Sequence, residues 1–194
     1  MNRNAPVDHP ISKVLVERHS PYAFDPDKDV SGDDLAALFE AARWAMSSYN
    51  AQPWRYIVGV KSHDRELWEK IHGVLVSGNQ PWAVNAPVLA LGIVENAFEH
   101  NGKPNKAAPH DLGAASAMLT VEAGARGLCV HQMIGIEVEA ARETFDISGT
   151  REPFTALAIG YPGNPDMISE KLGDRDRQPR ERKALDELII AGGW

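Results

Sequence analysis

Three short segments carry the side chains best suited to binding chemistry, and they lie far apart in the chain. They read RHS at residues 18–20, SSYNAQPW at 47–54 and PRERKAL at 179–185. Arginines can neutralise a phosphate, and hydroxyl and amide groups can hydrogen-bond a polar ligand. Each segment also has an ordinary structural interpretation, because surface cations are usually solvated and Ser or Asn commonly stops a helix. Taken singly, the segments leave both interpretations open.

The composition excludes several other classes of function. The 194 residues carry a formal net charge of −7, so no bulk attraction to nucleic acid or anionic lipid is expected. A phosphate-bearing ligand would need a local cluster of cations. The sequence has no signal-peptide pattern and no run of about 18 apolar residues, which predicts a soluble cytoplasmic protein. The single cysteine, Cys129, has apolar neighbours and is expected to be a buried thiol.

Other catalytic and metal-binding motifs are missing from the sequence. None of the seven histidines has zinc-motif spacing, and no GxSxG elbow or GxxxxGK[ST] phosphate loop occurs. The GxGxxG fingerprint is also missing, so we do not expect a Rossmann domain for a nicotinamide cofactor. Asp111 follows His110 at a predicted helix start, where capping is a more common role than acid–base catalysis. We therefore predict no metal site and name no acid–base residue.

Apolar periodicity predicts alternating helices and strands that must position the three segments. Strands are predicted at 55–60, 87–94 and 154–162, and helices at 8–18, 32–46, 63–77, 110–126 and 137–146, before a helical or strand-like tail at 184–190. Ser31 is expected to cap the second helix. The loop at 95–109 is of the kind that shapes access to a site. Strands separated by helices indicate an α/β or α+β fold.

The helix predicted at residues 110–126 has an unusual composition. It is rich in Gly, Ala and Ser and is apolar almost all round, which implies burial on several sides. Small residues allow a second helix to approach closely. A domain core could bury this helix alone, but in a chain this short a dimer interface explains it more naturally.

Together, the three segments resemble the nitroreductase family, whose members are oxidoreductases dependent on flavin mononucleotide (FMN). Residues 41–58 read AARWAMSSYNAQPWRYIV, similar to the family's Ala-Arg-x-Ala-Pro-Ser-Ser-x-Asn-x-Gln-Pro-Trp, with Met46 where proline is frequent. The early RHS, the Gly-Tyr-Pro at 160–162 and the basic Arg180-Glu181-Arg182 follow the family's order. The resemblance covers essentially the whole chain. It implies one α+β domain over 1–194, with a central, mostly antiparallel sheet, and a homodimer with flavin sites at its interface.

The resemblance also implies which side chains hold the FMN phosphate. That group is dianionic, and the planar fork of arginine can grip two of its oxygens at once. The assigned cations are Arg18, Arg180 and Arg182. Ser20 can add a hydroxyl donor, and His19 lies between it and Arg18 in the expected cofactor-binding set.

The resemblance also gives roles to the residues of the SSYNAQPW segment. The family places Ser47, Ser48 and Asn50 beside the cofactor, with contributions from both subunits. Gln52 and Trp54 are expected to hold the loop and its strand in place.

The remaining implied contacts concern the edge of the ring. Asn79 is either a ring-edge amide or a turn residue, and the two interpretations have equal weight. Gly135 and Ile136 match the position of a backbone amide near the reactive nitrogen, although a plain loop is equally consistent with the sequence. Relatives often carry cations where this chain has Tyr22 and Trp82. Their absence leaves the flavin's reduction potential open.

The implied activity is hydride transfer from NAD(P)H through FMN to small electron-poor acceptors by a ping-pong mechanism. Nitroaromatics, quinones and enones are the expected acceptors, with no nucleic acid or membrane partner. A specialised enone reductase or reductive dehalogenase is an alternative within the same family. A flavin-binding storage or redox-sensing protein without turnover is the alternative outside enzymes.

Overall fold

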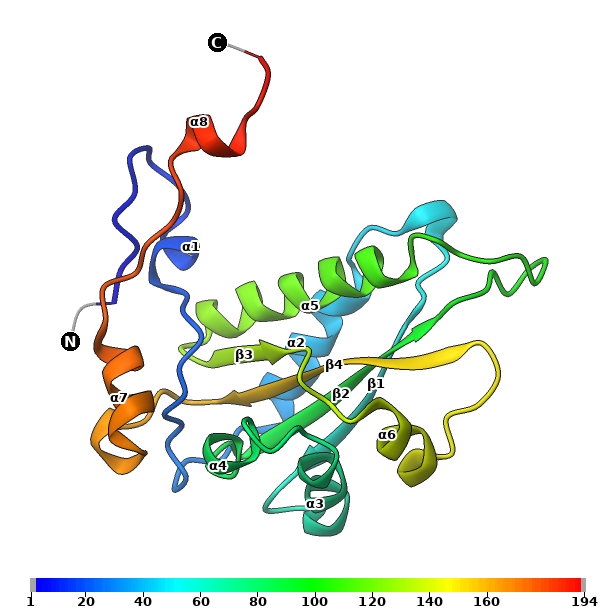
Figure 1. Ribbon diagram of the computed structural model, residues 1–194, viewed down its shortest axis with the longest axis horizontal. Helices are drawn as coiled ribbons and strands as arrows, with labels where there is room; N and C mark the ends of the chain where they lie inside the picture. Colours follow the sequence, from blue (N-terminus) through cyan, green and yellow to red (C-terminus); the bar gives the residue numbers. More distant parts are fainter. Residues whose placement is uncertain (1–2, 193–194) are drawn as a thin grey trace.

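A four-stranded antiparallel sheet forms the centre of the protein in a computed structural model that describes residues 3–192. Its strands are β1 (Trp54–Val60), β2 (Val88–Glu95), β3 (Cys129–Met133) and β4 (Arg151–Gly160). Their spatial order is β1-β2-β4-β3, and every neighbouring pair is antiparallel (Figure 1). The predicted α+β fold with a mostly antiparallel central sheet is therefore confirmed.

The two central strands, β2 and β4, are almost entirely buried. Their apolar runs pair with each other in the sheet, with Leu91 opposite Ala156. Continuous apolar sequence is needed there because helices cover both faces of the sheet. At β1, a Cβ on Gly59 would lie 2.6 Å from the Trp68 Cα, so glycine is what allows α3 (Arg65–Gly73) to pack directly on the strand.

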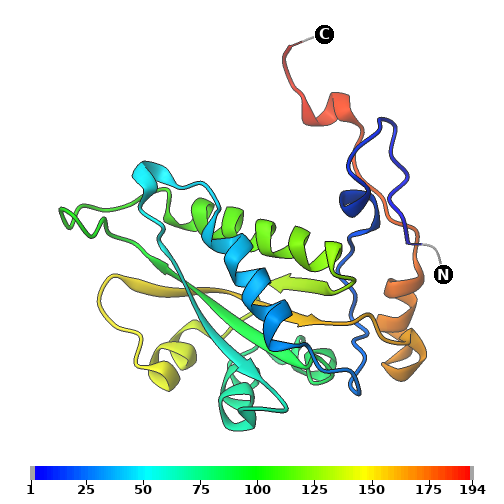
Figure 2. The ribbon, with the colours of Figure 1, turned by 180° about the vertical axis from the view of Figure 1, so that it is seen from behind.

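Each face of the sheet has its own apolar core and its own helices (Figures 1 and 2). On one face pack α2 (Gly32–Arg43) and α5 (Ala108–Ala125). On the other face pack α3, α4 (Gln80–Ala83) and α6 (Val138–Phe145). Ser31 caps α2 as predicted, because its Oγ accepts from the backbone N–H of Asp34 at 3.0 Å.

The two terminal segments lie side by side at one end of the sheet, beyond the last turn of α5 (Figures 1 and 2). The first contains α1 (Lys13–Glu17). The second contains the short helix η2 (Pro165–Met167), α7 (Glu170–Arg177) and α8 (Leu185–Leu188). Residues from opposite ends of the chain are thereby brought into contact.

Several predicted boundaries were wrong. The opening helix occupies only α1, since Pro10 interrupts residues 8–12 and no core lies beneath them. The second helix ends at Arg43, and Met46, predicted on its apolar face, is 68% exposed. The third helix is limited to α3, and turns follow it.

One strand and two α-helices were not predicted: β3, α4 and α7. Strand β3 reads CVHQM, without a clear alternation, and it forms by pairing with β4.

No helix within residues 3–192 combines the length and apolarity that crossing a bilayer requires.

Candidate functional site

Four arginines from opposite ends of the chain lie near one another where the terminal segments touch. Burial lowers the pKa of Arg180, and the positive charges of Arg18, Arg182 and Arg3 lower it further. Arg180 is also held in place, since its Nη1 donates to the carbonyls of Val16 at 2.7 Å and Arg3 at 3.0 Å. The structure thus brings together the three arginines that were predicted to share an anion, and it adds Arg3.

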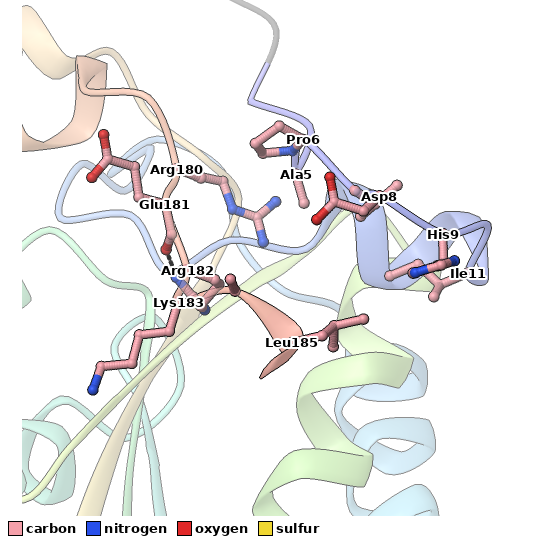
Figure 3. A pocket seen from close by; sticks show the side chains of 12 residues that line it. Ala5, Pro6, Asp8, His9, Ile11, Arg180, Glu181, Arg182, Lys183 and Leu185 are labelled. Carbon is pink, nitrogen blue, oxygen red and sulfur yellow. Dashed lines mark hydrogen bonds between the residues drawn. The ribbon is translucent and has the colours of Figure 1, made fainter. Parts of the chain in front are cut away.

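A cavity of about 550 Å³ opens beside this arginine cluster, between the N-terminal arm and the segment that follows α7. The Arg180 guanidinium points into the cavity, whereas the Lys183 ammonium points away from it (Figure 3). Arg182 also lines the cavity, and its Nη1 donates to the Glu181 carbonyl at 2.6 Å. The cluster therefore has an open side from which an anion can approach.

His19 and Ser20 follow Arg18 in the chain, and His19 is the more buried of the two. The exposed Ser20 hydroxyl accepts from the Arg18 guanidinium at 3.4 Å. The His19 ring points inward, with Nδ1 3.3 Å from the Glu17 carbonyl and Nε2 4.0 Å from the Cys129 Sγ. Burial lowers the pKa of His19 and raises that of Cys129 to about 11. Cys129 is therefore a buried, protonated thiol, as predicted.

A buried carboxylate joins the two terminal segments. Asp176 in α7 is 4% exposed, and it accepts hydrogen bonds from the backbone N–H groups of Tyr22 at 3.0 Å and Ala23 at 2.8 Å. The residues just before Tyr22 include Arg18, and the chain after α7 leads to Arg180. Asp176 therefore fixes how the two halves of the arginine cluster face each other. No local sequence signal marks Asp176, because α7 reads as a charged, exposed segment.

Replacing Asp176 by alanine should destabilise the protein. Asp176→Ala leaves the Tyr22 and Ala23 N–H groups without their acceptor, and we expect the free energy of unfolding to fall by about 3 kcal/mol. The control is Asp174→Ala in the same helix, which removes an exposed ion pair with Arg177 and should cost at most about 1 kcal/mol. Urea unfolding of the two variants measures the difference, and equal losses would contradict the proposed role of Asp176.

Two of the predicted ring-edge residues lie in direct contact. Asn79 Nδ2 donates to the Gly135 carbonyl at 3.0 Å, and the Val76 N–H donates to the same oxygen at 3.1 Å. Ile136 is 8% exposed, and its N–H donates to the Ile134 carbonyl at 2.8 Å. Within residues 3–192, the Gly135 N–H has no recorded hydrogen-bond acceptor. Of the two candidate backbone amides, Gly135 is thus the one available to a ligand.

Gly135 leaves no room for a side chain. A Cβ there would lie 2.5 Å from Asn79 Nδ2 and 2.8 Å from Val76 Cγ2. Gly135→Ala should therefore displace the Asn79 amide and lower the free energy of unfolding by about 1–3 kcal/mol. Gly78→Ala is the matched control, since nothing lies within 4 Å of its added Cβ. Thermal unfolding compares the two variants, and a fully stable Gly135→Ala would refute this account of the contact.

Tyr22 and Trp82, which stand where relatives often carry cations, belong to an aromatic cluster. Trp82 is 1% exposed and belongs to the core, and Tyr22 meets it edge-on with ring centroids 5.4 Å apart. The His131 ring packs against both, and its Nδ1 lies 2.9 Å from the Pro21 carbonyl. Burial lowers the pKa of His131. Trp82 is therefore a core side chain, so no ligand at the surface reaches it.

The SSYNAQPW segment lies at the other end of the molecule, beside the start of α5 (Figures 1 and 2). Its short helix η1 (Ser48–Asn50) is attached there, because the Ser48 N–H donates to Asp111 Oδ2 at 3.0 Å. Asp111 does not cap α5, whose N-cap is Ala107, so the predicted capping role was wrong. The helix starts earlier than predicted, with Pro109 in its first turn. Asp111 is buried and positions Ser48 instead.

The backbone of this segment is unusual. Tyr49, Asn50 and Gln52 have φ values of 52°, 53° and 46°, in the left-handed region that non-glycine residues rarely adopt. Gln52 is held by its N–H to Ser47 Oγ at 3.1 Å and by its side-chain amide to the Asn50 carbonyl at 3.2 Å. Trp54 is buried at the start of β1. The predicted holding roles of Gln52 and Trp54 are confirmed.

Helix α5 separates the arginine cluster from residues 47–50. Near its end, a Cβ on Gly124 would lie 3.8 Å from the Arg18 Cβ, and near its start Asp111 holds Ser48. At 1.5 Å per residue, the rise from Asp111 to Gly124 is about 20 Å. The structure therefore gathers Arg18, Arg180 and Arg182 at one end of the helix and leaves Ser47, Ser48 and Asn50 at the other.

Comparison with known proteins gives this geometry a context. The nitroreductase family model matches residues 15–81. An uncharacterised 15.4 kDa protein of Mycolicibacterium smegmatis is 33% identical over 146 residues, which cover 72% of this chain and 97% of the relative. The major NAD(P)H-flavin oxidoreductase of Aliivibrio fischeri is 50% identical over 50 residues, or 26% of this chain and 23% of that protein.

Solved structures extend the similarity to the whole chain. The crystal structure of an oxidoreductase containing FMN superposes with a TM-score of 0.90 at 30% identity, and the match covers 99% of this chain and 96% of that one. The antiparallel sheet with its two helical faces is thus the fold of a flavin-containing oxidoreductase. This chain belongs to the nitroreductase family.

Proposed function

We propose that this chain is an FMN-dependent oxidoreductase that takes a hydride from NAD(P)H and reduces small electron-poor acceptors such as nitroaromatics, quinones and enones. The observation that carries the proposal is the grouping of Arg3, Arg18, Arg180 and Arg182 beside an open cavity, on a chain whose net charge is −7. Such a cluster is costly without an anion. The family and the FMN-containing structural relative support the same cofactor.

The donor set fits the phosphate group of FMN. Burial, and then repulsion from the neighbouring arginines, lowers the pKa of Arg180, and a dianionic phosphate would offset both effects. Arginine forks can bind the phosphate oxygens in pairs. The Ser20 hydroxyl is exposed beside Arg18 and can add a donor. His19 follows Arg18 directly in the chain, but its ring is turned toward Cys129 and so offers this site no donor.

The pair Asn79 and Gly135 fits the polar edge of the flavin ring. Within residues 3–192 the Gly135 N–H donates to no backbone acceptor, whereas the Ile136 N–H donates to the Ile134 carbonyl in a tight turn. The chemistry that FMN would supply when bound is two-electron transfer from NAD(P)H to the acceptor. The chain's residues therefore bind, orient and exclude water, and the proposal assigns no general acid or base.

The complete site requires a homodimer. Along α5, Gly113 and Ala117 are exposed and Val121 is half-buried, at a spacing of four residues that forms one face of the helix. A twofold axis across the middle of that face brings the start of one α5 beside the end of the other. Ser47, Ser48 and Asn50 of one protomer would then meet the arginines, Asn79 and Gly135 of its partner.

The absorption spectrum of the purified protein tests the cofactor. The proposal requires a flavin band that is bleached by NADH or NADPH in the absence of oxygen and restored by a quinone or a nitroaromatic. A protein purified without flavin that cannot be loaded with FMN would refute the proposal. A bound flavin that neither nucleotide reduces would favour storage or sensing over turnover.

A further inference from the structure

An exposed aromatic pair stands beside the segment that we propose to contact the flavin. Tyr49 is 89% exposed, and its ring meets Phe98 edge-on, with centroids 6.0 Å apart and planes at 88°. Within residues 3–192, Phe98 is the only ring recorded against Tyr49. Core packing therefore does not account for the position of Tyr49.

Phe98 is presented by an ordered hairpin rather than by a loose loop. Ala97 forms a β-bridge with Pro104, and the Phe98 N–H donates to the Lys103 carbonyl at 2.8 Å. An ion pair of 2.8 Å between Arg55 and Glu99 fastens the hairpin to β1. The hairpin lies at the same end of α5 as η1 (Figures 1 and 2).

The backbone also fixes the direction of Tyr49. It lies between Ser48, held by Asp111, and Asn50, and both Tyr49 and Asn50 have left-handed φ. A non-glycine residue retains such a conformation only where its surroundings impose it, and such positions concentrate at functional sites. Ser48 and Asn50 are the proposed flavin contacts, so the Tyr49 ring projects from the segment that borders the cofactor.

We infer that Tyr49 and Phe98 form an aromatic wall of the acceptor site and favour flat aromatic acceptors over acceptors that cannot stack. This inference rests on the proposed function. Reduction of a quinone to its hydroquinone takes two electrons and two protons. NAD(P)H supplies the hydride and water the second proton, so the wall contributes binding and takes no part in the proton or electron balance. Ring contacts at offset or edge-on geometry stabilise such a ligand.

The test compares two acceptors on the FMN-loaded dimer. In Tyr49→Ala/Phe98→Ala, kcat/KM for 1,4-naphthoquinone should fall about tenfold, the size of one or two lost ring contacts. For ferricyanide, which cannot stack, kcat/KM should stay within about twofold of the wild type. Calorimetric titration of oxidised protein with 1,4-naphthoquinone, without NAD(P)H, should show the same loss of affinity.

Two control variants isolate the ring. Tyr49→Phe keeps the ring and should resemble the wild type. Trp44→Ala removes another exposed aromatic side chain, which contacts Glu40 and Arg43. This variant should leave kcat/KM unchanged for both acceptors. Equal effects on both acceptors, or unchanged naphthoquinone binding, would overturn the inference. Loss of FMN or of the dimer in Tyr49→Ala would also overturn it, by making Tyr49 a cofactor or interface residue. A wild-type protein without flavin would instead refute the proposed function.

Discussion

Two variants that are inactive on their own are expected to restore activity when their subunits are mixed. Arg18→Ala/Arg182→Ala removes two cations of the proposed phosphate site, and Ser48→Trp fills the proposed ring site from the other end of α5. If each site combines both protomers, a mixed dimer has one doubly altered site and one intact site. After free exchange of subunits, half of the dimers are mixed, so about a quarter of all sites should be intact.

The measurement is NAD(P)H oxidation with a quinone acceptor after exchange, together with the bound FMN per dimer. The reciprocal control places all three substitutions in one chain and mixes it with the wild type. A mixed dimer then has two singly damaged sites if the halves come from different protomers, and one intact site if they come from the same protomer. Wild-type homodimers leave about a quarter of all sites intact in the reciprocal mixture if sites are shared, and about half are intact if each site lies within one chain. Half-maximal activity there, with none in the first mixture although mixed dimers form, would show that each site lies within one chain. A monomer in analytical ultracentrifugation would remove the basis of the shared site.

The elements that were predicted correctly have local signals. β2 is a continuous apolar run, and α5 is a long helix of small and apolar residues whose burial leaves few alternatives. β3 was missed because its five residues include His131 and Gln132, and its pairing partner β4 starts well downstream. α7 was missed for a similar reason, since it is anchored by a contact between distant positions, that of Asp176 with Tyr22.

The candidate site shows the same contrast between local signals and long-range contacts. Sequence motifs pointed to Arg18, Arg180 and Arg182, but nothing local indicates that the three side chains lie close together. Arg3 belongs to no motif. Their proximity depends on two terminal segments that pack together through Asp176 and through the carbonyls that bind Arg180. Contacts of this kind join distant positions and leave no periodicity in the sequence.

The second large effect is expected at the phosphate. Arg18→Ala and Arg182→Ala should each weaken FMN binding by about 1.5–3 kcal/mol, or about 10- to 150-fold, the range for hydrogen bonds to a charged group. Riboflavin lacks the phosphate, so its affinity should change little in the same variants. Fluorescence titration of apoprotein with the two flavins measures both constants. The ratio of FMN to riboflavin affinity isolates the phosphate contribution from any general loss of folding.

Comparing alanine variants of different cations separates general charge attraction for FMN from specific contacts with its phosphate. Lys183 is the matched control, because it neighbours Arg182 and points away from the cavity (Figure 3), so Lys183→Ala should leave the FMN-to-riboflavin ratio unchanged. Arg180→Ala is expected to lower the ratio and also the stability, since its guanidinium holds the Arg3 and Val16 carbonyls. If Lys183→Ala lowered the ratio as much as Arg182→Ala, diffuse attraction would explain FMN binding. An unchanged ratio in both Arg18→Ala and Arg182→Ala would place the phosphate elsewhere.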